Sequence, residues 1–262
     1  MNPRILGPLF PTDREMNLNI AFLQRYFIWL VFLGILLFGL TAPSPGGEHV
    51  LLSEEFHNLD NWKPFYFPKI RTHSVYTITD GHILKAESRA SASAIIYKMR
   101  FNVYDYPMLE WRWKIENIYL KGDATKKSGD DYPLRLYVMF EYDPAKAGVL
   151  KKLKYETVKA LYGQYPPHST LNYIWANKSH SEKILTNPYA GEAKMIPVEQ
   201  GIKNLNTWQV EQTDIVEDYR SAFGKDPPAV ASLAIMNDSD DTGEHSVSYL
   251  DYIKIYRKAK IP

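Results

Sequence analysis

From Val50 onward, the chain is divided into short segments in which apolar and polar residues alternate, with turn-forming residues between them. Side chains of a β-strand point alternately to its two faces, so such segments fold as strands that bury one face. They mostly follow one another directly, which favours an antiparallel sandwich over parallel βαβ units. We predict strands at 50–56, 74–79, 82–88, 94–101, 108–115, 134–141, 169–176, 193–197, 208–215, 229–236 and 246–256, and turns at 61–64, 79–81, 121–123 and Gly201.

Two segments show helical periodicity instead. Segment 146–162 gathers its apolar residues near one face, and we interpret the lysines on its other faces as a solvated surface. Segment 214–223 begins at Asp214, a residue type that caps helix N-termini, and stops at Gly224. The apolar residues expected on one face of the first helix are Val149, Leu150, Leu153, Val158, Leu161 and Tyr162. The predicted fold is a mostly β, jelly-roll-like antiparallel β-sandwich at 50–258 with two short helices.

An uninterrupted apolar run, predicted as a helix at 26–42, follows Arg25 and the N-terminal region 1–25. A linker at 43–49, which contains proline and glycine, separates it from the sandwich. The run is typical of a secretory signal peptide or a short membrane anchor, and both alternatives stay open. With the arginine side retained inside, the later residues face away from the cytoplasm. We therefore expect an exported protein that is periplasmic or, if the segment is uncleaved, anchored to the inner membrane.

Composition restricts the partners of the sandwich. The 262 residues carry 31 Lys and Arg against 30 Asp and Glu, and a net charge of +1 does not provide the field that nucleic-acid-binding proteins need. Aromatic residues make up 14% of the chain, and exposed aromatic rings stack against the flat faces of sugars. The sequence contains no cysteine, which excludes disulfides and thiol nucleophiles.

An acidic turn at 237–244 carries a dense set of oxygen ligands for a cation. Its spacing from Asp238 through Asp240 matches the first positions of an EF-hand calcium loop, but Tyr249 occupies the twelfth position, where such loops need a bidentate glutamate. Two alternatives remain. One is a different calcium site built from Asp238, Asp240 and Glu244, and the other is a solvated turn between two strands.

The two ends of the sandwich resemble galactose-binding-like jelly-roll domains and the carbohydrate-binding modules built on them. The opening segment 51–56 contains Glu55, and the closing segment 249–255 contains Asp251. The resemblance implies that the first and last strands pair and that a structural calcium ion is held by Glu55 and Asp251. A salt bridge at the rim of the core is the alternative for Asp251, because an acid on an apolar face needs a partner.

Four segments, at 129–138, 171–177, 217–224 and 237–243, together resemble the signature segments of the bacterial family named domain of unknown function 3047. Membership implies an exported β-sandwich without an established activity. Each segment joins acids or amides to aromatic residues near the end of a strand. We predict that the segments meet on one face and bind a carbohydrate or another polyhydroxy ligand, since sugars bind to flat apolar faces and planar polar groups.

Eight residues are the candidates for ligand binding in this pocket: Asp130, Asp131, Arg135, Asn172, Trp175, Asp218, Asp238 and Asp240. Trp175 has two open roles, as a stacking platform for a sugar or as a residue of the core. Arg135 needs a partner in a half-buried position, and we predict that it pairs with Asp131 or Asp238.

A non-catalytic envelope module is the function that these features favour, and two alternatives stay open. Paired carboxylates, for example Asp130 or Asp131 with Asp218 or Asp238, could serve a hydrolase or lyase of envelope polysaccharide if they lie at a suitable separation. The sequence lacks the serine-hydrolase elbow and the zinc-protease motif. The second alternative is a structural or interaction protein that docks a partner through segment 146–162.

Overall fold

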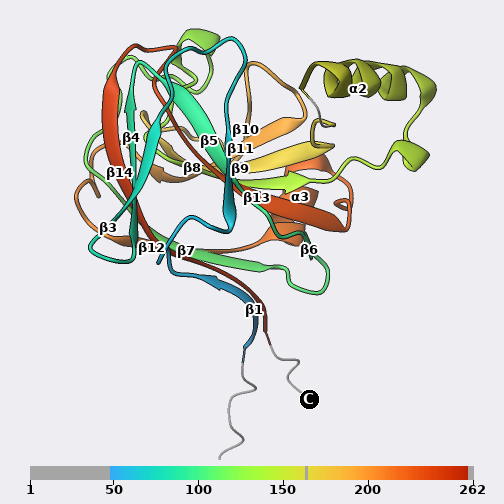
Figure 1. The fold of residues 1–262 in the computed structure, drawn as a ribbon, viewed down its shortest axis with the longest axis horizontal. Coiled ribbons are helices and arrows are strands. Elements are labelled where there is room, and N and C mark those ends of the chain that lie inside the picture. The colour runs from blue at the N-terminus through green and yellow to red at the C-terminus, as the bar shows by residue number, and fades with distance from the viewer. Residues whose placement is uncertain (1–47, 163–164, 259–262) are drawn as a thin grey trace, which may run out of the picture. The chain divides into compact units, whose positions relative to one another are not determined.

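Two β-sheets pack against each other in the residues that the computed structural model describes, 48–162 and 165–258 (Figure 1). The smaller sheet contains β1 (His49–Glu54), β3 (Val75–Thr79), β4 (Ile83–Arg89), β7 (Met108–Ile115), β12 (Gln209–Asp214) and β14 (His245–Arg257). The larger sheet contains β2 (Trp62–Phe65), β5 (Ala92–Tyr97), β6 (Phe101–Asn102), β8 (Arg135–Phe140), β9 (Ser169–Ala176), β10 (Leu185–Thr186), β11 (Ala193–Gln200) and β13 (Val230–Asp238). The remaining elements are helices α2 (Val149–Tyr162) and α3 (Ile215–Phe223) and short 3-10 turns at Lys127–Gly129 and Pro144–Lys146.

The strand pairs are antiparallel, as predicted, except that β11 runs parallel to β9. The smaller sheet has the order β12-β7-β14-β4-β3, and the larger sheet has the order β10-β11-β9-β8-β13-β5-β2. Strand β14 pairs with β4 as far as Leu250 and with β1 from Ile253 onward. The opening and closing strands therefore lie side by side, as the jelly-roll resemblance implied, and Asp251 lies where β14 changes partner.

Most of the predicted strands are confirmed, and β7 and β9 begin and end at the predicted residues. The predicted turn at 61–64 is wrong from Trp62 onward, because residues 62–65 form β2, whereas Asn61 lies in a turn. The two-residue strands β6 and β10 were not expected. Trp62 is buried in the core, whereas Lys63 and Pro64 are exposed at the edge of the larger sheet. A proline is tolerated in an edge strand because its missing N–H costs no ladder hydrogen bond there.

The core between the sheets is rich in aromatic side chains. Trp111 and Trp113 of β7 and Tyr173 and Trp175 of β9 are fully buried. The ring centroids lie 5.1 Å apart for Trp111 and Tyr173 and 5.8 Å apart for Trp113 and Trp175, a spacing at which tilted rings attract each other. These contacts fix which side of β9 faces the core and thus which side faces outward.

The two helices differ in how well the sequence predicted them. Helix α3 has the predicted caps, since the Asp214 side chain accepts two backbone N–H groups and Gly224 adopts a left-handed conformation with φ 66°. The apolar residues predicted for one face of α2 are exposed where their side chains are described, since Val149, Leu150 and Leu153 are 84%, 86% and 67% exposed. The helix instead packs through Tyr155, whose ring centroid lies 4.2 Å from that of Tyr142.

The larger sheet is covered on its outer face as well as on its inner face. All eight side chains of β9 and seven of the nine in β13 are buried, whereas β4 of the smaller sheet alternates between buried and partly exposed. Successive side chains point to opposite faces, so the outer side of the larger sheet also lies under other residues. This outer cover comes from the end of β2 and the segment after it. Phe65, Phe67 and Ile70 pack there against Ala94 and Met236 of the sheet.

The predicted signal or anchor segment at 26–42, its flanking region 1–25 and most of the linker lie outside the described residues. Within the ranges that are described, none of the helices has the length and apolar character needed to cross a bilayer.

Candidate ligand-binding groove and acidic cluster

The outer face of the larger sheet is hollowed by two adjoining cavities of about 440 and 500 Å³. Both are lined by Ile96, Met139 and Tyr165, so they form one depression, which we name the outer groove. Its floor is the sheet itself, and the segment 165–167 forms one side. This volume is in the range of pockets that hold small ligands.

Aromatic and sulfur-containing side chains line the smaller of the two cavities. They are Phe65, Phe67, Tyr137, Met139, Tyr165 and Met236. Phe65 and Tyr137 are only partly buried, and the Phe65 ring stands edge-on to Phe67 with centroids 5.1 Å apart. The groove thus offers accessible ring faces of the kind on which sugars stack.

Strand β9 supplies two buried polar atoms without hydrogen-bond partners among the described residues, Oγ1 of Thr170 and Oδ1 of Asn172. Thr170 lines the groove, and Asn172 lies two residues further along the strand on the same face. A buried polar atom that stays unpaired costs about 1–3 kcal/mol. A hydroxyl group of a ligand in the groove would satisfy Thr170 Oγ1, whereas Asn172 is buried and does not line the groove.

Arg135 is the first residue of β8, and it lies on the same outward face as Tyr137, two residues later. Its guanidinium forms an ion pair with Asp238, and its Nε donates to Asp238 Oδ1 at 3.0 Å. Its Nη2 donates to the backbone oxygen of Asp130 at 2.8 Å, and Nη1 lies 3.6 Å from the Asp130 carboxylate. Arg135 is 4% exposed, so this is a buried network, and the predicted pairing of Arg135 with Asp238 is confirmed.

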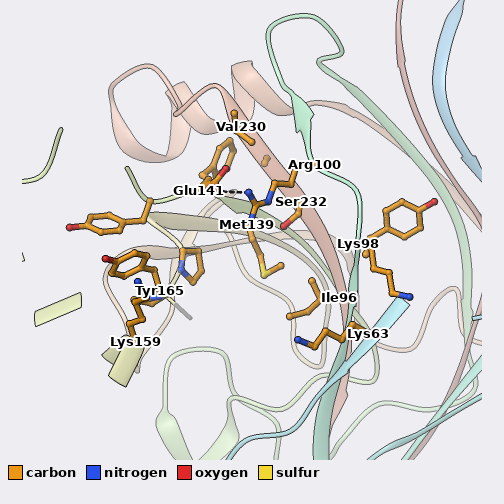
Figure 2. A pocket seen from close by; sticks show the side chains of 16 residues that line it. Lys63, Ile96, Lys98, Arg100, Met139, Glu141, Lys159, Tyr165, Val230 and Ser232 are labelled. Atoms are coloured by element: carbon orange, nitrogen blue, oxygen red, sulfur yellow. Dashed lines mark ion pairs between the residues drawn. The ribbon is translucent and has the colours of Figure 1, made fainter. Parts of the chain in front are cut away.

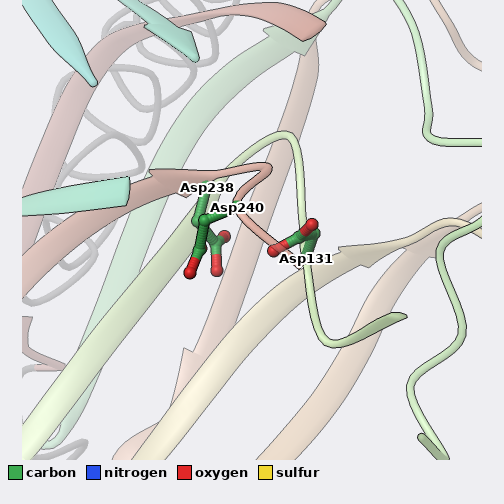
Figure 3. Close-up of side chains that lie close together, drawn as sticks. All are labelled: Asp131, Asp238 and Asp240. Atoms are coloured by element: carbon green, nitrogen blue, oxygen red, sulfur yellow. The ribbon is translucent and has the colours of Figure 1, made fainter. Parts of the chain in front are cut away.

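Asp131 connects this network to the acidic turn. Its carboxylate is fully buried and accepts the backbone N–H groups of Asp241 at 3.3 Å and Thr242 at 2.5 Å. One oxygen each from Asp131, Asp238 and Asp240 lie within 4.8 Å of one another, and Figure 3 shows the three carboxylates gathered between the turn and the sheet. We name these three residues the acidic cluster.

The acidic cluster concentrates negative charge that Arg135 compensates only in part. Partial burial raises the pKa of Asp240, and the charge of Asp131 raises it further. Burial likewise raises the pKa of Asp241, against the effect of the hydrogen bond donated by Tyr189. Asp240 and Asp241 are therefore harder to ionise than the acids of a fully solvated turn.

Six of the eight predicted site residues lie on one outer side of the larger sheet or in the loops at its end, and two do not. Trp175 lies in the core, where its Nε1 donates to the backbone oxygen of Gly201 at 3.0 Å, so its ring is closed to a ligand. Asp218 of α3 instead accepts hydrogen bonds from Tyr173 and Thr213. None of the eight residues lines the outer groove, and a ligand-binding role for the six that lie together stays a prediction.

Glu55 and Asp251 line one hollow of about 390 Å³ on the smaller sheet. Asp251 accepts a hydrogen bond from Arg112 at 2.7 Å and lies 3.7 Å from His82 Nε2, while Glu55 lies 3.6 Å from His57. The guanidinium beside Asp251 already supplies the positive charge that a calcium ion would bring. The calcium site at Glu55 and Asp251 stays a prediction, and the charges around it do not fit the metal.

Sequence reasoning missed the residues of the outer groove. A pattern in β8 and β13 could have indicated these residues. Both strands contain apolar residues at consecutive positions, as in Tyr137–Met139 and 233–236, where a half-exposed strand would alternate apolar and polar residues. A strand that is apolar on both sides belongs to a sheet that is covered on both faces.

Among solved structures, several are similar to the chain in outline. The enzymatically active domain of bacteriophage CBA120 tailspike protein 4 has 8% identity and a TM-score of 0.36, with 80% of this chain and 21% of that chain covered. Lectin I-B4 from Griffonia simplicifolia has 11% identity and a TM-score of 0.35, covering 78% and 98%. The carbohydrate recognition domain of Emp46p has 9% identity and a TM-score of 0.36, covering 81% and 97%.

At TM-scores this low, the likeness assigns neither a ligand nor an activity to this chain. The search of curated proteins found no match. Residues 60–254 match the family described as protein of unknown function (DUF3047), and this match spans the sheets, the outer groove and the acidic cluster. The chain therefore belongs to the DUF3047 family.

Proposed function

We propose that the β-sandwich binds a carbohydrate in the outer groove as a non-catalytic module. The observation that carries the proposal is the combination found there, namely accessible aromatic rings next to a buried hydroxyl group that lacks a partner. Phe65 and Tyr137 provide ring faces, and Thr170 Oγ1 has no hydrogen-bond partner in the described ranges. Sugars need both kinds of contact, because they have apolar ring faces and hydroxyl groups around the rim.

The acidic cluster supports the groove rather than a reaction in this proposal. Asp131 is fully buried and holds two backbone N–H groups of the turn, and Asp238 is paired with Arg135. A carboxylate that attacks or protonates a glycosidic bond needs access to the substrate. The alternative of a hydrolase or lyase thus has no observation in its favour at Asp131 or Asp238.

The proposal places the module outside the cytoplasm. The apolar run at 26–42 supports this location, because such runs are typical of export signals and membrane anchors. Fusion of an alkaline phosphatase reporter after the last residue tests the location, because this reporter is active only after export. An inactive fusion protein that accumulates at normal levels would contradict it.

Binding is tested by calorimetric titration of the full-length chain with a panel of neutral and acidic oligosaccharides. Thr170→Val removes the unpaired hydroxyl while keeping the shape of the side chain, so we expect about fivefold weaker saccharide binding without a loss of thermal stability. Thr77→Val, at an exposed strand position of the smaller sheet away from the groove, is the control. Absence of binding to every saccharide would overturn the proposal.

A structural calcium ion remains part of the proposal as a prediction. Among the described residues the acidic cluster offers the oxygen donors, whereas Arg112 already compensates the charge of Asp251 at the predicted pair with Glu55. Thermal unfolding in calcium and in a chelator tests it, because an ion that binds only the folded state raises the melting temperature. An unchanged melting temperature at millimolar calcium would exclude a structural ion.

A further inference from the structure

We infer that the saccharide of the outer groove is anionic, with carboxylate or other acidic groups on its sugar rings. This inference rests on the proposed function and concerns the same groove. It comes from the larger of the two adjoining cavities, whose side chains differ in charge from those of the smaller one.

Four cationic residues line the larger cavity: Lys63, Lys98, Arg100 and Lys159. Glu141 is the single acidic residue among its lining side chains, and its carboxylate lies 3.0 Å from Arg100. The chain as a whole has a net charge of +1, so this local excess of positive charge does not simply follow the composition. A groove lined by one sign of charge attracts ligands of the opposite sign.

The cations stand on several sides of the cavity instead of forming one row. Figure 2 shows Lys159 and Tyr165 on one side, Lys63 and Lys98 on the opposite side, and Arg100 with Glu141 beyond Met139. They come from elements far apart in the sequence, with Lys63 in β2 and Lys159 in α2. A ligand that lies across the floor would meet positive charge at both of its edges.

Two of the lysines are available to such a ligand. Lys63 is exposed and has no ion pair with a carboxylate of the described residues. The ammonium group of Lys159 lies 4.3 Å from the centroid of the Tyr165 ring, so positive charge and an aromatic face occur side by side. A sugar ring stacked near Tyr165 would bring an acidic substituent within reach of Lys159.

The apolar part of the groove is what makes a saccharide a better occupant than a small inorganic anion. The cationic cavity continues into the cavity lined by Phe65 and Tyr137, and both parts share Ile96, Met139 and Tyr165. An extended ligand with several acidic groups and flat faces would fill both cavities, whereas a phosphate ion would use only one end.

The test compares a hexamer of galacturonic acid with the same hexamer after complete methyl esterification, by calorimetry on the full-length chain. The two probes have the same sugar rings, and esterification replaces each carboxylate with a neutral methyl ester. We expect the acidic hexamer to bind about tenfold more tightly at low salt, and the difference to shrink as salt screens the charges.

The double variant Lys63→Gln with Lys159→Gln should abolish the preference for the acidic hexamer. The double variant Lys183→Gln with Lys203→Gln, an equal charge change at exposed loop positions outside the groove, should leave it unchanged. Equal binding of both hexamers would overturn the anionic ligand but leave carbohydrate binding intact. Binding of a neutral saccharide from the panel without binding of either hexamer would have the same meaning. Absence of binding to any saccharide would overturn both proposals.

Discussion

The two outer faces of the sandwich differ in what they present to solvent. The smaller sheet carries paired charges there, such as Arg112 with Asp251 and Lys85 with Glu87. The larger sheet carries the outer groove, with aromatic rings, and buries the ion pair of Arg135 and Asp238. The outer face of the smaller sheet is thus polar, whereas the outer face of the larger sheet leaves apolar surface partly accessible.

This difference indicates which residues stabilise the fold and which are available to bind a ligand. Exposed ion pairs contribute little to the free energy of unfolding, because water competes for both charges. Accessible aromatic rings also contribute less to folding than buried ones, and they retain the surface that a ligand can cover. Substitutions on the two faces should therefore have distinct effects on stability and on binding.

The largest effect should come from breaking the buried ion pair of the larger sheet. Arg135→Met leaves Asp238 and Asp130 without their cation in a buried site, and we expect the free energy of unfolding to fall by about 3–5 kcal/mol. Urea denaturation measures this. The double variant Arg135→Met with Asp238→Asn should recover part of the loss, and a single variant as stable as the wild type would show that the pair is not buried in solution.

A second test asks whether the smaller sheet accepts charge on its inner side as well as on its outer side. Burial raises the pKa of Glu211, on the inner side of β12, to about 7, and the charge of Glu199 adds to this against the hydrogen bond from Trp113. The folded state thus favours the protonated acid. Its contribution to stability is complete below the unfolded pKa near 4.5 and is lost as pH rises through about 7.

Glu211→Gln imitates the protonated acid, so the variant should be more stable than the wild type at pH 8, by about 2 kcal/mol. The two proteins should have similar stability at pH 4. Urea denaturation at several pH values measures the difference. A difference that does not change with pH would show that Glu211 stays ionised on the inner side of the sheet.

Next in size is an effect on binding at the outer groove. Phe65→Leu keeps an apolar side chain but removes the ring, and we expect about tenfold weaker binding of the saccharide with a stability change below about 1.5 kcal/mol. Tyr66→Leu is the matched control, because Tyr66 is 55% exposed and does not line the groove. Calorimetry and thermal unfolding separate the two effects, and equal affinity losses in both variants would remove Phe65 from the site.

The smallest effect should be seen at the ion pair of the smaller sheet. Asp251→Asn weakens the contact with Arg112, and we expect a loss of less than about 1 kcal/mol because Arg112 is partly exposed. Urea denaturation in low and high salt measures it. A loss as large as that of Arg135→Met would show that the two faces do not differ in the way described.

How far the sequence predicts the fold depends on which sheet is considered. Strands such as β4 and β7 alternate cleanly, and their positions were predicted closely. Strand β2 was missed because Pro64 and Asn61 look like turn residues when read alone, while the edge position that tolerates a proline is set by distant strands. The outward direction of Val149 and its neighbours in α2 likewise depends on tertiary packing, which periodicity alone does not fix.

The candidate site was predicted where its residues lie at strand ends. Arg135 and Asp238 are paired, and Asp131 holds the acidic turn beside them. Trp175 was grouped with Asn172 although the two are three positions apart in one strand, so alternation places them on opposite faces. The groove residues could not be assigned because β2, β8 and α2 meet only through the topology of the larger sheet.

The pairing of β1 with β14 has a mechanical consequence. His49 lies opposite Arg257, so the places where the chain enters and leaves this pair of strands are neighbours at the same end. Tension between these two points would pull the strands apart like a zipper, breaking one bonded pair after another instead of shearing them all at once. The first strand would peel away under low force, while the groove on the opposite sheet kept its shape.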